Sequence, residues 1–245
     1  IYGFRGAMAE SMQYLSDTFN CTELPLSITY RCGSDIVKEA QTVFPDDIQA
    51  APHIHRGVIR YSTVAQEGYD ADTLVLCRVN GPLIQMAYDL LARDIACHVR
   101  GRDIGNGLVS LIRKQDAPTV SLLIDRLTEW KEREIAAATA QDDDPKIQRV
   151  TDKYESLMLF CGRVGMINTH AQPQAVIDMI EALFEQGRGV CLSTVHKAKG
   201  LEARRCMLLQ PHLFDQCISR AHHVWQQEQE RNALYVAITR AQQEL

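Results

Sequence analysis

The densest group of side chains able to do chemistry lies in residues 190–202, VCLSTVHKAKGLE. After an apolar run, this stretch carries a hydroxyl (Thr194), an imidazole (His196) and two ammonium groups (Lys197 and Lys199). The apolar run predicts a short buried strand. The polar side chains would then lie at the carboxyl end of the strand and in the loop after it, which is where α/β sheets bind ligands.

The charge around this stretch indicates an anionic ligand. Residues 188–205 contain five arginine or lysine residues and one glutamate, in a chain whose formal net charge is −5. A local basic cluster in an acidic protein is typical of a site for an anion, most simply a phosphate backbone. A solvated loop with a few lysines explains the same residues equally well, so this stretch alone leaves both interpretations open.

The pattern along the rest of the chain predicts an α/β fold. Apolar runs predict strands at residues 24–28, 73–77, 96–99, 190–194 and 206–209. Helical spacing follows several of them, with Ser34 as the expected N-cap of one helix. Residues 102–187 are helical in pattern. Strand–helix alternation that is interrupted by a helical block favours a parallel sheet with an inserted α-helical subdomain.

Three further segments, taken together with TVHKAKGLE at residues 194–202, indicate a family. They are IYGFRGA at residues 1–7, LSITYRCGSDIV at 26–37 and ERNALYVAITRAQQEL at 230–245. In this order the four segments resemble motifs III, IV, V and VI of the UvrD/Rep-like superfamily 1 DNA helicases. Any one of them is a weak signal, whereas four in family order are a specific one. Outside these segments the resemblance is loose.

The resemblance implies a domain organisation. In the family, the C-terminal RecA-like motor domain, called 2A, has a P-loop-NTPase-type parallel sheet flanked by helices. It carries an insert, called 2B, between motifs IV and V. We therefore expect the 2A domain at residues 1–101 and 188–245, and a reduced 2B-like helical insert at 102–187. The insert is shorter than is usual, and the strand that follows TRA is expected to be cut off at Leu245.

The resemblance assigns four residues to ATP. Arg240, in TRA, matches the family's arginine finger, and Arg31, in TYR, matches the other arginine that reaches the γ-phosphate. Tyr30 matches the aromatic residue that stacks on adenine, and Glu202 matches an acidic contact near the ribose. Taken singly, Arg240 is explained by the dipole at a helix C-terminus, and Tyr30 by packing at a strand edge. The conjunction of the four favours the functional interpretation.

The resemblance assigns a second set to single-stranded DNA: Tyr2, Phe4, Arg5, Thr194, His196, Lys197 and Lys199. The two aromatic residues and the arginine match positions that stack on or clamp bases, a contact that does not depend on base sequence. The hydroxyl and the imidazole match contacts to the strand, and the two lysines add charge for phosphates. For Tyr2 and Phe4, packing in the core is the competing interpretation.

The expected cofactor is ATP with Mg²⁺. The sequence contains no GxxxxGK[ST] phosphate loop. We therefore expect that loop and the Mg²⁺ ligands in an N-terminal RecA-like domain of the same parent chain, which is the expected protein partner. The isolated chain is expected to be inactive as an ATPase.

Composition bounds the class of protein. The eight cysteines form no CxxC pair, so we expect no metal site and interpret them as reduced thiols of a cytoplasmic protein. No apolar run approaches the ~20 residues of a membrane span, so we expect no membrane partner.

These observations together predict the C-terminal motor domain of an ATP-dependent DNA helicase. Its 3′–5′ polarity is implied by the resemblance alone. Two alternatives stay open. A helicase-like arm of a recombination nuclease has the same motifs. A non-catalytic motor relic would hold DNA or a partner protein, but it would have no use for γ-phosphate arginines. The chain departs from the family at Ala203, where an aromatic residue is usual, and at Asn232, where many members have a second arginine.

Overall fold

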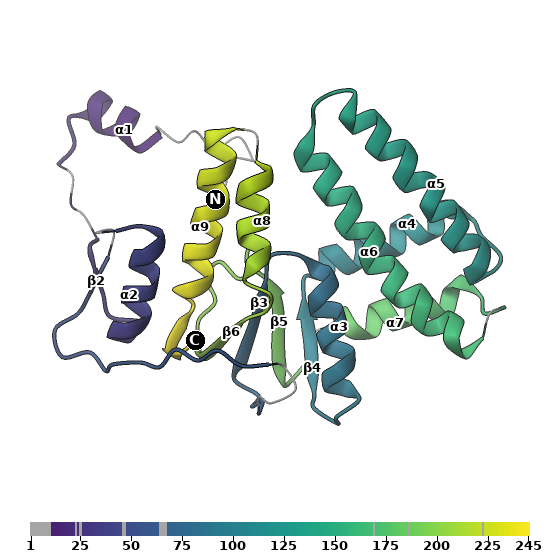
Figure 1. Ribbon diagram of the computed structural model, residues 1–245, viewed down its shortest axis with the longest axis horizontal. Coiled ribbons are helices and arrows are strands. Elements are labelled where there is room, and N and C mark those ends of the chain that lie inside the picture. The colour runs from purple at the N-terminus through teal and green to yellow at the C-terminus, as the bar shows by residue number, and fades with distance from the viewer. Residues whose placement is uncertain are drawn as a thin grey trace. The chain divides into compact units, whose positions relative to one another are not determined.

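The computed structural model describes residues 11–22, 24, 26–45, 48–63, 68–168, 170–185, 187–221 and 223–245. The chain divides into two units: unit 1 comprises Ile1–Glu67 and Ala198–Leu245, and unit 2 comprises Gly68–Lys197. Helices accompany the strands in both units (Figure 1). The strands β3 to β7 all belong to parallel pairs. This confirms the predicted α/β class and is consistent with a RecA-like fold.

The α/β part of unit 2 is built on a buried strand pair. In this unit β5 (Val190–Thr194) lies between β3 (Thr73–Cys77) and β4 (Cys97–Arg100), with Leu192 opposite Val75. β3 is buried at every position, as expected for a parallel strand that is covered on both faces. Because β5 is paired on both sides, it fixes the position of the residues that follow it.

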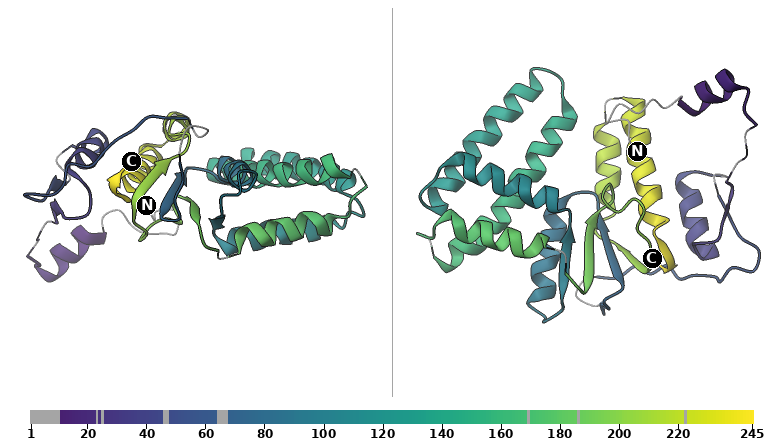
Figure 2. Two further views of the ribbon diagram at one scale, coloured as in Figure 1. Left: turned by 90° about the horizontal axis from the view of Figure 1, so that it is seen from below. Right: turned by 180° about the vertical axis from the view of Figure 1, so that it is seen from behind.

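The helical block of unit 2 consists of α4 (Arg102–Gln115), α5 (Val120–Thr139), α6 (Asp144–Ile167) and α7 (Pro173–Phe184). α5 and α6 form an antiparallel hairpin that extends away from the strands of this unit (Figures 1 and 2). The side chains of Thr119 and Asp143 cap the N-termini of α5 and α6, because each accepts a backbone N–H that has no partner inside its helix. Unit 2 extends beyond this block, and the extent of the expected insert, residues 102–187, stays a prediction.

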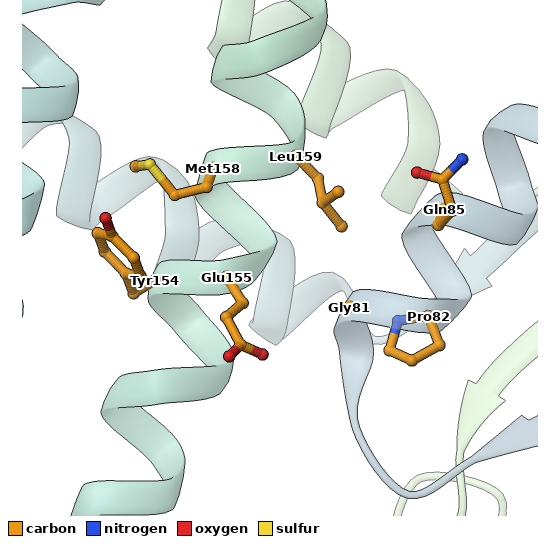
Figure 3. Close-up of a pocket in the computed structure, with 7 residues that line it drawn as sticks. All are labelled: Gly81, Pro82, Gln85, Tyr154, Glu155, Met158 and Leu159. Atoms are coloured by element: carbon orange, nitrogen blue, oxygen red, sulfur yellow. The ribbon is translucent and has the colours of Figure 1, made fainter. Parts of the chain in front are cut away.

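α6 is joined to α3 (Asn80–Leu91), the helix that follows β3. The Asp152 carboxylate on α6 accepts hydrogen bonds from the Asn80 backbone N (2.8 Å) and side-chain Nδ2 (2.6 Å). An acidic cap of this kind also suits the positive end of the helix dipole. Beside this contact lies an apolar hollow of about 470 Å³, which is lined from α3 by Gly81, Pro82 and Gln85 and from α6 by Tyr154, Glu155, Met158 and Leu159 (Figure 3).

Unit 1 contains a second parallel pair. β6 (Ala203–Leu208) pairs with β7 (Ala241–Glu244). Two helices precede β7: α8 (His212–Arg220) and α9 (Val224–Ile238). α2 (Ser34–Val43) packs against α9.

The N-terminal part of unit 1 also contains α1 (Ser11–Phe19) and two short strands, β1 (Ile28–Thr29) and β2 (Gln49–Ala50). β1 pairs with β2 in parallel.

Several local predictions were wrong. The strand expected at 24–28 is reduced to β1, and Leu24 and Leu26 are 83% and 95% exposed. Pro25 interrupts this run in the sequence, and proline cannot donate to a strand ladder. The strand expected to be cut off after TRA is present as β7, and α2 begins at Ser34, so that Gly33 occupies the N-cap. Among the described residues, no helix has both the length and the apolarity needed to cross a bilayer.

Gly189 lies in the turn before β5, and its backbone geometry can be tested by substitution. Its φ is +96°, and an added Cβ would lie 2.0 Å from the carbonyl oxygen of Ala96. That oxygen accepts the first hydrogen bond of β5, from Val190 N (2.9 Å). We expect Gly189→Ala to lower the free energy of unfolding by about 2–4 kcal/mol through backbone strain and overpacking, measured by urea denaturation.

The matched control is Gly162→Ala on α6, where an added Cβ meets nothing within 4 Å. This variant should gain roughly 1 kcal/mol from helix propensity. Equal midpoints for the two variants would contradict the turn geometry before β5.

Candidate functional site

A charged pair joins two distant parts of unit 1. Arg31 follows β1, and its backbone N donates to Thr29 Oγ1 (3.3 Å), which turns the chain after the strand. The Arg31 Nε donates to Glu202 Oε2 at 2.5 Å. The two side chains are 39% and 46% exposed, so the pair is partly open to solvent. Among the described residues, nothing accepts from the two Nη groups of Arg31.

Arg240 is the most constrained cation of the site. It follows α9 and is only 9% exposed. Its Nε donates to the Val236 carbonyl (2.9 Å), its Nη1 to the Leu201 carbonyl (3.0 Å), and its Nη2 to Thr239 Oγ1 (3.2 Å). A guanidinium has five N–H groups. One N–H on each Nη nitrogen is therefore left for a further acceptor.

The backbone brings the two arginines to the same place. Leu201, which binds Arg240, is followed directly by Glu202, which binds Arg31. Glu202 and Arg240 also precede neighbouring parallel strands, because Ala203 of β6 is in register with Ala241 of β7. The Ala203 N donates to the Arg240 carbonyl (3.1 Å). The amino ends of β6 and β7 therefore hold this cluster.

A close backbone approach fixes the turn that carries Arg31. Gly33 N donates to the Gln242 carbonyl of β7 (2.9 Å). A Cβ on Gly33 would lie 2.7 Å from the Cα of Gly57, so only glycine fits between these backbones. Cys32 directly follows Arg31 and is buried. Its thiol donates to the carbonyl of Thr239, the residue before Arg240 (3.6 Å).

The electrostatics of the cluster favour an anion. Burial lowers the pKa of Arg240, and the positive charge of Arg31 lowers that pKa further. Burial raises the pKa of the Cys32 thiol, so this group adds no negative charge at neutral pH. Two guanidinium groups thus share one carboxylate, Glu202, and both retain N–H groups suited to oxygens of a phosphate.

Tyr30 adds a flat surface beside this cluster. It precedes Arg31 directly and is 79% exposed. Among the described residues its ring stacks on no other ring. The structure thus brings Arg31, Glu202 and Arg240 together, with Tyr30 next to them in the chain.

The residues assigned to DNA sit around the end of β5. Thr194 is its last residue and is 7% exposed, and its carbonyl accepts from Lys197 N (3.0 Å), which closes a turn. His196 is half-buried and Lys199 is exposed. Tyr2, Phe4 and Arg5 lie outside the described residues and stay predictions.

Lys197 is not an isolated cation. Its Nζ donates to the Asp103 carboxylate in the first turn of α4. This hydrogen bond lowers the pKa of Asp103. Sequence reasoning missed Asp103, because nothing in its local pattern points to a partner ninety-four positions away. A phosphate at Lys197 has to compete with this carboxylate.

Residues 130–245 match the UvrD-like helicase C-terminal domain family. The matched part contains Glu202, Arg240 and the loop after β5, whereas Tyr30 and Arg31 precede it. A comparison with curated proteins found no match.

The geometry of Arg240 predicts a structural role that is separable from chemistry. Arg240→Ala should lower the free energy of unfolding by about 2 kcal/mol, because it leaves the buried Val236 carbonyl and the part-buried Leu201 carbonyl without their charged donor. Arg31→Ala removes only a partly exposed pair, and it should change stability by less than about 1 kcal/mol. Urea denaturation of both variants makes the comparison, and equal losses would mean that Arg240 is not held as described.

Proposed function

We propose that the chain carries a helicase motor domain, because residues 130–245 match the UvrD-like helicase C-terminal domain family, and we propose a specific role for it. It is the C-terminal motor domain of an ATP-dependent DNA helicase with 3′–5′ polarity. The observation that carries this proposal is the meeting of Arg31, Glu202 and Arg240 through the consecutive residues 201 and 202. A motor relic that only binds DNA has no use for two arginines with N–H groups left for phosphate oxygens.

The residues present fit ATP at this cluster. Arg240 offers one N–H on each Nη nitrogen, which is the fork geometry that matches two phosphate oxygens. Arg31 offers its Nη groups, and the exposed Tyr30 ring offers a face for the adenine. Glu202 stands next to Arg31 for a ribose hydroxyl.

The chemistry of hydrolysis comes from ATP with Mg²⁺. The phosphate loop and the metal ligands are proposed to lie in the N-terminal RecA-like domain of the same parent, because this sequence has no GxxxxGK[ST]. By itself, the chain is therefore proposed to have no ATPase activity.

Arg240 acts by preorganisation. Three of its N–H groups are already held by Val236, Leu201 and Thr239, so its orientation is fixed before any phosphate arrives. Fixed donors that face developing negative charge stabilise a transition state without reorganisation. Arg31 is held more loosely, and Glu202 neutralises it when no phosphate is near. Arg240 is thus the finger, and Arg31 responds to the presence of the nucleotide.

The DNA strand is proposed to run along the end of β5. His196, Thr194 and Lys199 would contact it there, together with Tyr2, Phe4 and Arg5. Lys197 shares its charge with Asp103, so its contribution to phosphate binding is reduced. Sequence-independent stacking and phosphate contacts suit a motor that moves along any strand.

The test of the ATP assignment uses the full-length parent. Arg240→Lys keeps the charge but loses the fork, and it should lower DNA-stimulated ATP turnover by roughly 10³. Affinity for single-stranded DNA without nucleotide should stay unchanged. Arg204→Lys is the control, because Arg204 is exposed on β6 and donates to Gln243 (2.7 Å) away from the cluster. If the ATP turnover of Arg240→Lys stays within twofold of the wild type, the assignment of Arg240 as the arginine finger is wrong.

The test of the DNA assignment uses Asp103. Asp103→Asn removes the carboxylate that holds Lys197, so single-stranded DNA should bind more tightly. The slope of log affinity against log salt should steepen, by at most about 0.7 for one additional phosphate contact. Lys197→Gln should flatten the slope, and the two opposite changes should add up to no more than about 0.7, the value of one phosphate contact.

The double variant Asp103→Asn/Lys197→Gln is the control, and it should behave like Lys197→Gln alone. If Asp103→Asn leaves both affinity and slope unchanged, Lys197 does not meet the strand.

A further inference from the structure

The helical block holds a polar cavity of about 410 Å³ between α4, α5 and α6. Gly107, Ser110, Leu111 and Lys114 line it from α4, at the spacing of one helix face. α5 adds Trp130, Arg133 and Glu134, which also share a face, and α6 adds Lys153. Ligand sites of small molecules have volumes of about 300–1,000 Å³, so this space is large enough for a nucleotide unit.

The cavity carries an excess of positive charge. Lys114, Arg133 and Lys153 line it. In the part of the chain that the structure describes, none of these three takes part in an ion pair. The carboxylate of Glu134 is already bound by Lys146 (3.1 Å). The lining thus has three cations and one carboxylate, and this excess of positive charge in a chain with a net charge of −5 attracts a polyanion.

Trp130 gives the cavity a flat apolar wall. Its side chain is half-buried, and among the described residues its indole contacts no other ring. Base stacking on an aromatic side chain does not depend on base identity. A nucleotide uses the three cations and the flat indole together, through its phosphate and its base. The neighbouring hollow between α3 and α6 is apolar, and its charged lining residue is a carboxylate, Glu155 (Figure 3).

We propose that this cavity binds one nucleotide unit of a single nucleic-acid strand. Lys114, Arg133 and Lys153 hold the phosphate, and Trp130 stacks on the base. The proposal deepens the function proposed above, since it adds a second strand contact to a helicase motor domain. It rests on different residues from the ATP cluster and from the loop after β5.

The test uses the 245-residue chain and its own fluorescence. The sequence has two tryptophans, Trp130 and Trp225. Trp225 lies on α9 and stacks on His223 (6.2 Å), so Trp225→Phe leaves Trp130 as the only tryptophan. Titration with a short oligothymidylate should quench Trp130 with saturation. An abasic oligonucleotide of the same length should still bind, as measured by the anisotropy of a label, but should not quench.

Two further ligands, a mononucleotide and an acidic peptide, are compared with the oligonucleotide. Thymidine monophosphate has the same chemistry, and it should quench only at concentrations at least tenfold higher than the strand, because it lacks the neighbouring phosphates. Tighter binding of the mononucleotide would overturn the strand proposal. An acidic peptide that displaces the oligonucleotide and binds more tightly would overturn it as well.

Neighbouring cations on α4 give the matched charge test. Lys114 lines the cavity, whereas Arg113 faces Glu181 (3.9 Å) and does not line it. Lys114→Gln should weaken the Trp130-detected affinity about fivefold and flatten the salt slope by about 0.7. Arg113→Gln should change neither. Equal effects of the two substitutions, or quenching by the abasic strand, would refute the site.

The outcome is independent of the ATP cluster. Arg240→Lys should leave the Trp130 titration unchanged, and loss of quenching would leave the turnover test of Arg240 intact. Failure of one proposal can therefore be told from failure of the other.

Discussion

Unit 1 depends on the burial of one permanent charge. A guanidinium does not lose its proton in proteins, so the 9% exposed Arg240 needs acceptors in place of water. Its acceptors come from the end of α9, from Thr239 and from the loop residue Leu201. Arg240 directly precedes β7, which pairs with β6. Satisfying the charge therefore fixes the helix end, the loop and the strand register together.

This constraint unites two explanations that compete at the level of sequence. An arginine after a helix is stabilised by the helix dipole, and a finger arginine is aimed at a phosphate. In the structure, the hydrogen bond from Arg240 Nε to the Val236 carbonyl is a contact with the C-terminal end of the helix. This bond occupies Nε, and one N–H on each Nη nitrogen remains for the phosphate contact that a finger arginine makes. The structural role supplies the rigidity on which the proposed chemical role depends.

The sequence predicted elements whose evidence is local. β3 and the helical character of residues 102–187 were expected, because buried apolar runs and helical periodicity are strong signals. β7 was expected to be cut off but is present: its AQQE sequence has little strand propensity, and pairing with β6 holds it in place. The ion pairs Arg31–Glu202 and Lys197–Asp103 were also missed, because each joins residues far apart in the chain. The family resemblance named three of these four residues but not their bonds.

The cations of this acidic chain differ in how firmly they are held, and the difference suits different ligands. Arg240 is buried and held by three hydrogen bonds, which favours one phosphate geometry and penalises others. Lys114 and Lys153 are exposed at a cavity rim, and long ammonium side chains follow a phosphate through a range of positions. A motor needs both behaviours, because hydrolysis requires fixed geometry while a moving strand requires tolerance. Lys197 lies between these limits, since Asp103 holds it but leaves it partly exposed.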